Sequence, residues 1–220
     1  MILPYSTVPA YSTDVSYHLS YLCQFMQDPM IDAYDAGLGV LAYLHQSKDV
    51  GLTYGGPHRS CPVAEANTEE AIIVFADGSF GKSAYPYGGG FSWWQNSVLS
   101  WFAQKPKFAP DSTCMMEMDM LVRGLKNALF DRNVLEDMHC FTKAPHVISD
   151  SKSAIDIIRN PGVTKRSAHY ERRLFFARDA YLYERMVPFL CPTDKMMADM
   201  MTKVVDKNKF FLCRNYMMNL

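Results

Sequence analysis

One stretch of the sequence constrains the fold more than any other. Residues 71–76 read A-I-I-V-F-A without a polar interruption, and Asp77 and Gly78 follow at once. Apolar runs of this length without polar alternation are typical of a strand buried on both faces of a sheet. The sequence therefore predicts a central strand over residues 70–79 that ends by delivering the Asp77 carboxylate to one edge of the sheet.

Composition favours a globular protein with a substantial core. Of 220 residues, 49% are hydrophobic and 20% are charged, which suits one domain of ordinary size or one domain with a small appendage. The formal net charge of −1 argues against a generally basic surface. Residues 152–185 nevertheless carry eight Lys and Arg against four Asp and Glu, which allows a local basic face.

The six cysteines are dispersed and form no C-x-x-C pair, which is typical of reduced thiols and not of a disulfide framework or a zinc module. No apolar run approaches the roughly 20 residues that a membrane span needs, and the first ten residues lack a secretory pattern. We therefore expect an intracellular protein, cytoplasmic or nuclear, that does not contact a membrane.

Periodicity and turn signals divide the chain into short elements. Apolar residues recur at helical spacing over residues 14–44, and Asp28-Pro29 separates two helices there. A basic, aromatic helix is expected over residues 168–183, and a last helix should carry Asp199. The remaining expected elements are a short strand near 50–54, a hairpin of residues 88–96 and 98–104, a helix from Pro110 to about Leu135, a strand over 145–149, a helix from Ser151, and an edge strand over 185–190.

This order of elements predicts an α/β fold with a mixed sheet covered by helices, because an antiparallel meander is followed by strand–helix crossovers. Asp77 and Asp150 both follow apolar runs, so they should lie at the carboxyl ends of parallel strands, where ligands bind in such sheets. Each acid alone would ordinarily be a solvated charge. Together with Glu117 and Asp199, they would form an oxygen-rich site of the kind that Mg²⁺ prefers.

Several blocks of the sequence share a further pattern. They are S-T-C-M-M-E at 112–117, S-D-S-K-S-A-I at 149–155, K-R-S-A-H at 165–169 and A-D-M-M-T-K at 198–203. These blocks resemble the S-T-C-E-A-E-Y, C-D-N-Q-S-A-I, K-R-T-K-H and A-D-I-L-T-K segments of the RNase H region of copia-type retrotransposon polyproteins. Residues 14–44 resemble the tail of the reverse transcriptase that precedes it.

The resemblance implies an RNase H-like mixed five-stranded sheet flanked by helices, with an N-terminal helical appendage. Residues 1–60 would be the helical tail, and residues 61–220 the RNase H-like domain. The implied partners are an RNA–DNA hybrid and the remainder of a reverse transcriptase polyprotein.

The implied activity is metal-dependent hydrolysis of the RNA strand of such a hybrid, in which 2′-hydroxyls mark the strand to be cut. Two Mg²⁺ ions, or Mn²⁺ in their place, would activate the water and stabilise the leaving oxyanion. By resemblance, Asp77 would bridge both ions and Asp199 would hold the ion that activates water. Glu117 and Asp150 would hold the other ion.

Four arginines of the basic segment are candidates for phosphate contacts: Arg166, Arg172, Arg173 and Arg178. A solvated helix face explains them equally well. His169 could act as a general acid, although packing or phosphate binding suits its basic, aromatic surroundings at least as well.

Two alternatives remain at this point. Met115, Lys152 and Ala168 depart from the family pattern, which is consistent with a catalytically decayed or co-opted RNase H fold that binds a nucleic acid or a protein. The other alternative is an integrase-like nuclease that acts on DNA. Retention of all four acids favours a hydrolase over the first, and the A-D-x-x-T-K ending favours RNase H over the second.

Overall fold

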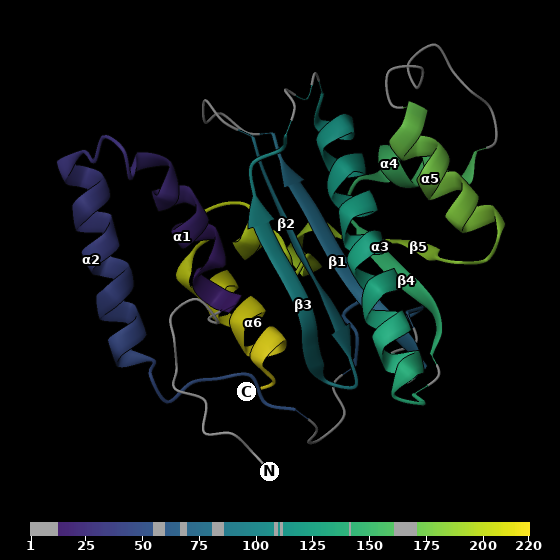
Figure 1. Cartoon of the computed structure of the whole chain (residues 1–220), viewed down its shortest axis with the longest axis horizontal. Helices are drawn as coiled ribbons and strands as arrows, with labels where there is room; N and C mark the ends of the chain where they lie inside the picture. The colour runs from purple at the N-terminus through teal and green to yellow at the C-terminus, as the bar shows by residue number, and fades with distance from the viewer. Residues whose placement is uncertain are drawn as a thin grey trace.

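A mixed sheet forms the centre of the molecule (Figure 1). The computed structural model describes residues 13–54, 60–66, 70–80, 86–107, 110, 112–140, 142–160 and 171–220, with the backbone alone at 171 and 172. In the sheet, β1 (Ala71–Ser79) pairs antiparallel with β2 (Tyr87–Trp94) and parallel with β4 (Lys143–Ser149). The strands β3 (Ser97–Gln104) and β5 (Val187–Leu190) complete the order β3-β2-β1-β4-β5. The predicted α/β fold with a mixed five-stranded sheet is therefore confirmed.

The central strand β1 is buried on both faces, as its unbroken apolar run predicts. Successive side chains point to opposite faces of a strand. Ile72 and Val74 accordingly contribute to one hydrophobic core, and Ile73 and Phe75 contribute to a second. Each face of the sheet must therefore be covered by its own layer.

Helices supply both covering layers. The first core includes buried residues of α3 (Thr113–Asp137), α4 (Lys152–Arg159) and α5 (Glu171–Leu182). The second includes residues of the 3-10 helix η6 (Asp199–Met201) and of α6 (Lys207–Met218), and η5 (Thr193–Lys195) precedes them. Within the part of the chain that the structure describes, none of the helices combines the length and the apolar character that crossing a bilayer requires.

Two predicted helix starts depend on serine caps. The Ser112 hydroxyl accepts a hydrogen bond from the Met115 N–H at the start of α3. The Ser151 hydroxyl accepts one from the Ala154 N–H at the start of α4. Such caps satisfy N–H groups that have no partner inside the helix. The caps fix where each helix begins, and thus where Glu117 and Asp150 lie.

The N-terminal region forms a separate group of short helices beside β3 and α6. It consists of η2 (Thr13–Val15), α1 (Ser16–Leu22), η3 (Cys23–Phe25) and α2 (Ile31–Gln46). The helix break predicted at Asp28-Pro29 is confirmed. Tyr17 of α1 packs edge-on against Tyr87 of β2, and Tyr43 of α2 packs edge-on against Phe210 of α6. The division of the chain at residues 60 and 61 stays a prediction.

Two expected elements are wrong. Residues 50–54 form no strand: the Thr53 N–H donates to the Met218 carbonyl and the Thr53 carbonyl accepts from the Ser97 hydroxyl, so this segment joins no strand ladder. The last helix expected around Asp199 is instead the pair of 3-10 helices η5 and η6. The long C-terminal helix is α6, which begins where the Asp206 carboxylate accepts hydrogen bonds from the Asn208 and Lys209 N–H groups.

Candidate metal centre

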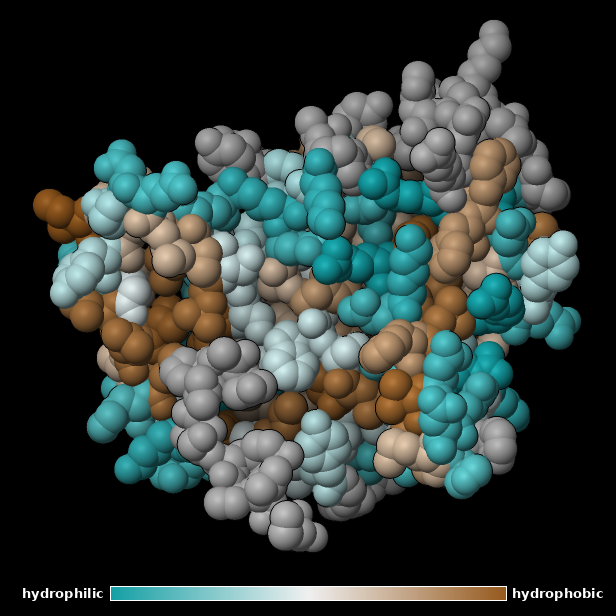
Figure 2. Space-filling view, viewed as in Figure 1, coloured by the Kyte–Doolittle hydropathy of each residue, from teal (hydrophilic) through white to brown (hydrophobic). Residues whose placement is uncertain are grey.

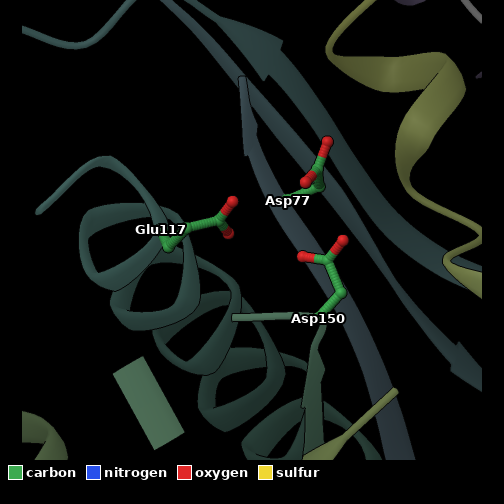
Figure 3. Close-up of side chains that lie close together, drawn as sticks. All are labelled: Asp77, Glu117 and Asp150. Atoms are coloured by element: carbon green, nitrogen blue, oxygen red, sulfur yellow. The ribbon is translucent and has the colours of Figure 1, made fainter. Parts of the chain in front are cut away.

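Three acidic side chains from three different elements face a common space (Figure 3). Asp77 comes from β1, Glu117 from the second turn of α3, and Asp150 directly follows β4. One oxygen of each carboxylate lies within 4.8 Å of the others. Asp77 and Glu117 are buried, while Asp150 is partly exposed. The geometry therefore offers three carboxylates to one ligand from the solvent side.

The parallel pairing of β1 and β4 brings the two aspartates together. Phe75 pairs with Ile148, and each aspartate follows two residues later in its own chain segment. The carboxyl ends of parallel strands meet at the same edge of a sheet, which is the position expected from the sequence. The register of this pair therefore sets the separation between Asp77 and Asp150.

A glycine lets α3 approach β1 closely enough to add the third acid. A Cβ atom at Gly78 would lie 2.9 Å from the carbonyl carbon of Met116 and 3.0 Å from the backbone nitrogen of Glu117. Any larger residue would have to push the first turns of α3 away. The absence of a side chain at Gly78 therefore allows α3 to place Glu117 next to Asp77.

Burial dominates the electrostatics of the site. Burial, together with the neighbouring charges of Asp77 and Asp150, raises the pKa of Glu117 to about 9. Burial also raises the pKa of Asp77, although Lys203 and the Thr202 hydroxyl oppose the shift. At neutral pH, Glu117 in the ion-free protein therefore holds a proton.

Asp199 lies beside this group and not within it. Among the described residues, the group of three acids whose oxygens all lie within 4.8 Å of one another is Asp77, Glu117 and Asp150. Asp199 is buried in η6, and its two oxygens lie 2.7 Å from Lys203 Nζ and 3.4 Å from Lys209 Nζ. The structure thus brings together three of the four predicted acids and pairs the fourth with lysines.

Residues that the sequence prediction did not select contact Asp77. The Thr202 hydroxyl donates a hydrogen bond to Asp77 Oδ2, and Lys203 Nζ lies 3.8 Å from the same oxygen. The available signal was the T-K of the A-D-M-M-T-K block, which directly follows η6. These contacts tie the segment after η6 to the end of β1.

The predicted arginines have different surroundings. Arg173 forms an ion pair with Asp119, which lies two residues after Glu117 on α3, and it remains partly exposed. Arg178 is buried and its Nε donates to the Ile157 carbonyl, a position that does not favour phosphate contact. Arg166, His169 and the side chain of Arg172 lie outside the described residues.

The donor set of the centre fits a hard divalent cation. All three side chains offer carboxylate oxygens, which are the ligands that Mg²⁺ and Mn²⁺ prefer. Glu117 accepts a backbone hydrogen bond from Gly78, while its Oε2 is buried with no hydrogen-bond partner in the described part of the chain. A buried acceptor without a partner is costly, and a cation beside the other two carboxylates would satisfy it.

Comparison with known proteins connects the chain to a retrotransposon polyprotein. The chain is 26% identical over 201 residues to the retrovirus-related Pol polyprotein from transposon TNT 1-94 of Nicotiana tabacum. The match covers 91% of this chain but 14% of that protein. The predicted resemblance to retrotransposon polyproteins is confirmed by this match. No protein-family model matches the chain.

Solved structures that align with this chain include RNase H domains. The N-terminal RNase H domain of rv2228c from Mycobacterium tuberculosis aligns with a TM-score of 0.48 and 17% identity, covering 66% of this chain and 96% of that one. LC11-RNase H1 in complex with an RNA/DNA hybrid aligns with a TM-score of 0.47 and 14% identity, and the alignment covers 60% of this chain and 93% of that one. The foamy viral protease-reverse transcriptase in complex with an RNA/DNA hybrid aligns with a TM-score of 0.48 and 11% identity, and the alignment covers 81% of this chain and 28% of that one.

Proposed function

We propose that this chain is a ribonuclease H that uses divalent metal ions to hydrolyse the RNA strand of RNA–DNA hybrids. The observation that carries the proposal is the convergence of Asp77, Glu117 and Asp150, with Glu117 Oε2 unpartnered. The match to a Pol polyprotein supports it, because such polyproteins are the family whose RNase H segments the sequence resembles.

The carboxylates would hold two Mg²⁺ ions, which supply an activated water and stabilise the leaving oxyanion when bound. By the resemblance, Asp77 would serve as a ligand for both ions, Glu117 and Asp150 would hold one of them, and Asp199 would help hold the other. Thr202 keeps one oxygen of Asp77 fixed by its hydrogen bond. Because a carboxyl group binds a cation in its deprotonated form, Glu117 would have to give up its proton to hold one.

The proposed substrate surface includes the basic segment around α5. Arg173 is connected to α3, the helix that carries Glu117, through its ion pair with Asp119. We include Arg166 and Arg172 in the proposed phosphate contacts on the basis of the sequence. Arg178 is left out because its guanidinium is buried and bonded to the Ile157 carbonyl.

The decisive experiment is a cleavage assay with three labelled substrates: an RNA–DNA hybrid, duplex RNA and duplex DNA. We expect cutting of the hybrid RNA in Mg²⁺ or Mn²⁺ and none in EDTA. Asp77→Asn should reduce cutting to background, because the amide accepts from Thr202 but cannot replace a charged metal ligand.

Other outcomes have distinct meanings. Equal cutting of duplex DNA would point to a DNA nuclease of the integrase type. Hybrid binding without cutting, in the wild-type protein with Mg²⁺, would point to a decayed binding module. Cutting by Asp77→Asn at the wild-type rate would show that the candidate centre is misplaced.

A further inference from the structure

Lys203 occupies a position that the proposed function does not use. Its Nζ atom lies 2.7 Å from Asp199 Oδ1 and 3.8 Å from Asp77 Oδ2. It therefore stands between two acids that, in the proposed mechanism, hold the same ion. A lysine has no lone pair to offer a metal while it is charged, so it cannot act as a ligand there.

The charge balance makes Lys203 a counter-ion of the two acids. Burial lowers the pKa of Lys203, but the charges of Asp77, Asp199 and Asp150 and the hydrogen bond to Asp199 outweigh burial and raise it. A lysine ammonium group is ordinarily charged at neutral pH, and here it lies against two carboxylates. It neutralises part of the repulsion between carboxylates that are buried close together.

The Lys203 side chain is also able to leave. It is 41% exposed, whereas the side chains of Asp77 and Asp199 are 3% and 7% exposed. A lysine has a flexible four-carbon stem, so its ammonium group can swing into water while the acids stay in place. Lys209 is less free, because its Nζ also donates to the Asp194 carbonyl.

We propose that the Lys203 ammonium group competes with a divalent cation for the oxygens of Asp77 and Asp199. Binding of the cation on this side of the centre then requires Lys203 to turn outward to solvent. Lys203 is in this sense a positioning residue that stabilises the ion-free acids and sets the cation concentration at which the centre fills. The inference rests on the proposed function, because it assumes that the acids bind a divalent cation.

The first test compares Mg²⁺ binding to the wild-type protein, Lys203→Met and Lys143→Met by isothermal titration calorimetry. Lys143→Met is the matched control, since Lys143 pairs with Glu70 on the surface and starts β4 at the end away from Asp150. We expect Lys203→Met to bind Mg²⁺ about tenfold more tightly, which corresponds to a charge–charge interaction of about 1.4 kcal/mol. Lys143→Met should bind like wild type.

The second test needs no substitution and so does not depend on a variant that folds. Wild-type protein is treated briefly with acetic anhydride, with and without Mg²⁺, and the acetylation of each lysine is measured by mass spectrometry. We expect Mg²⁺ to increase the acetylation rate of Lys203 several-fold relative to Lys143, because the displaced amine becomes more exposed and loses its ion pairs.

The outcomes separate this inference from the proposed function. Unchanged or weaker Mg²⁺ binding by Lys203→Met, or a Lys203 acetylation rate that Mg²⁺ leaves unchanged, overturns the competition even if the wild-type protein cuts hybrids. If the wild-type protein binds no Mg²⁺ but Lys203→Met does, the competition is supported. If neither protein binds Mg²⁺, both the inference and the metal centre fail.

Discussion

At the residue scale, Glu117 makes the stability of the ion-free protein depend on pH. Its pKa is about 9 in the folded chain, against an ordinary value of 4.5. Between these values the folded protein retains a proton that the unfolded chain has lost. The contribution of Glu117 to the free energy of unfolding is therefore fully present below pH 4.5 and is lost as the pH rises toward 9.

Glu117→Gln removes this dependence, since the amide carries no proton to lose. In EDTA, the variant should unfold at a similar urea concentration to wild type at pH 5 and be more stable than wild type by several kcal/mol, up to roughly 5, at pH 8.5. Urea unfolding at the two pH values measures the difference. A variant that is less stable at pH 8.5 would show that the carboxylate is held charged by a partner.

Arg173 offers a second prediction at the residue scale, on nucleic-acid affinity. If Arg173 contacts a phosphate, Arg173→Ala should weaken hybrid binding and reduce the slope of log K against log salt by about 1. The binding is measured in Ca²⁺ by fluorescence anisotropy at several salt concentrations.

The matched control for Arg173→Ala is Arg132→Ala. This substitution removes the same charge as Arg173→Ala, but Arg132 pairs with Glu136 near the other end of α3. We expect it to leave the slope unchanged. Equal slopes for wild type and Arg173→Ala would assign Arg173 to the ion pair with Asp119 alone.

At the element scale, periodicity predicted most of the helices and strands because each buries one apolar face or run. The run before Asp77 and the apolar residues before Asp150 both led to correct strands. The segment around Asp199 did not follow this rule. Its methionines are buried although the backbone forms a short 3-10 helix, so composition there indicated burial and not the type of helix.

The position of Asp199 shows why part of the site could not be predicted from sequence. The four acids were expected to converge, yet the pairing of Asp199 with Lys203 and Lys209 depends on how η6 and α6 pack. Lys203 is four residues from Asp199, a common spacing for an ion pair. Its approach to Asp77, more than a hundred residues earlier, leaves no periodic signal in the sequence.

Gly78 gives an element-scale prediction, because it sets the distance between β1 and α3. Gly78→Ala should destabilise the protein by about 1–3 kcal/mol, since the new Cβ would overlap the Met116 backbone. It should also weaken Mg²⁺ binding by moving Glu117. Thermal unfolding and calorimetry measure the two effects.

Gly37→Ala is the control for this substitution. Gly37 lies inside α2, and a Cβ there would meet nothing within 4 Å. Alanine is the better helix former by up to about 1 kcal/mol, so this variant should be slightly more stable than wild type. A Gly78→Ala protein that behaves like Gly37→Ala would mean that α3 shifts without cost.

At the scale of the whole molecule, the N-terminal helices present an apolar surface to solvent (Figure 2). None of the residues of α2 is buried. Its inner residues Ala36, Val40 and Tyr43 line a cavity of about 520 Å³ together with Phe210 and Phe211 of α6. Its outer apolar residues are exposed, and they are Ile31, Tyr34, Leu38 and Leu41. A helix with apolar residues on both sides is unusual where one side meets water.

The exposed side of α2 therefore should tolerate charge in this chain. Leu38 and Leu41 are 47% and 58% exposed, so replacing both by Glu removes little buried area and should change the free energy of unfolding by less than about 1 kcal/mol. The same double variant should be more soluble, because it interrupts an apolar patch with charge.

The control is Leu121→Ala on α3. Leu121 is fully buried, so this substitution should lower the free energy of unfolding by about 2–5 kcal/mol. Urea unfolding measures the stability of each variant, and precipitation by polyethylene glycol measures its solubility. A loss of stability in the double variant comparable to that of Leu121→Ala would show that this side of α2 is packed in solution.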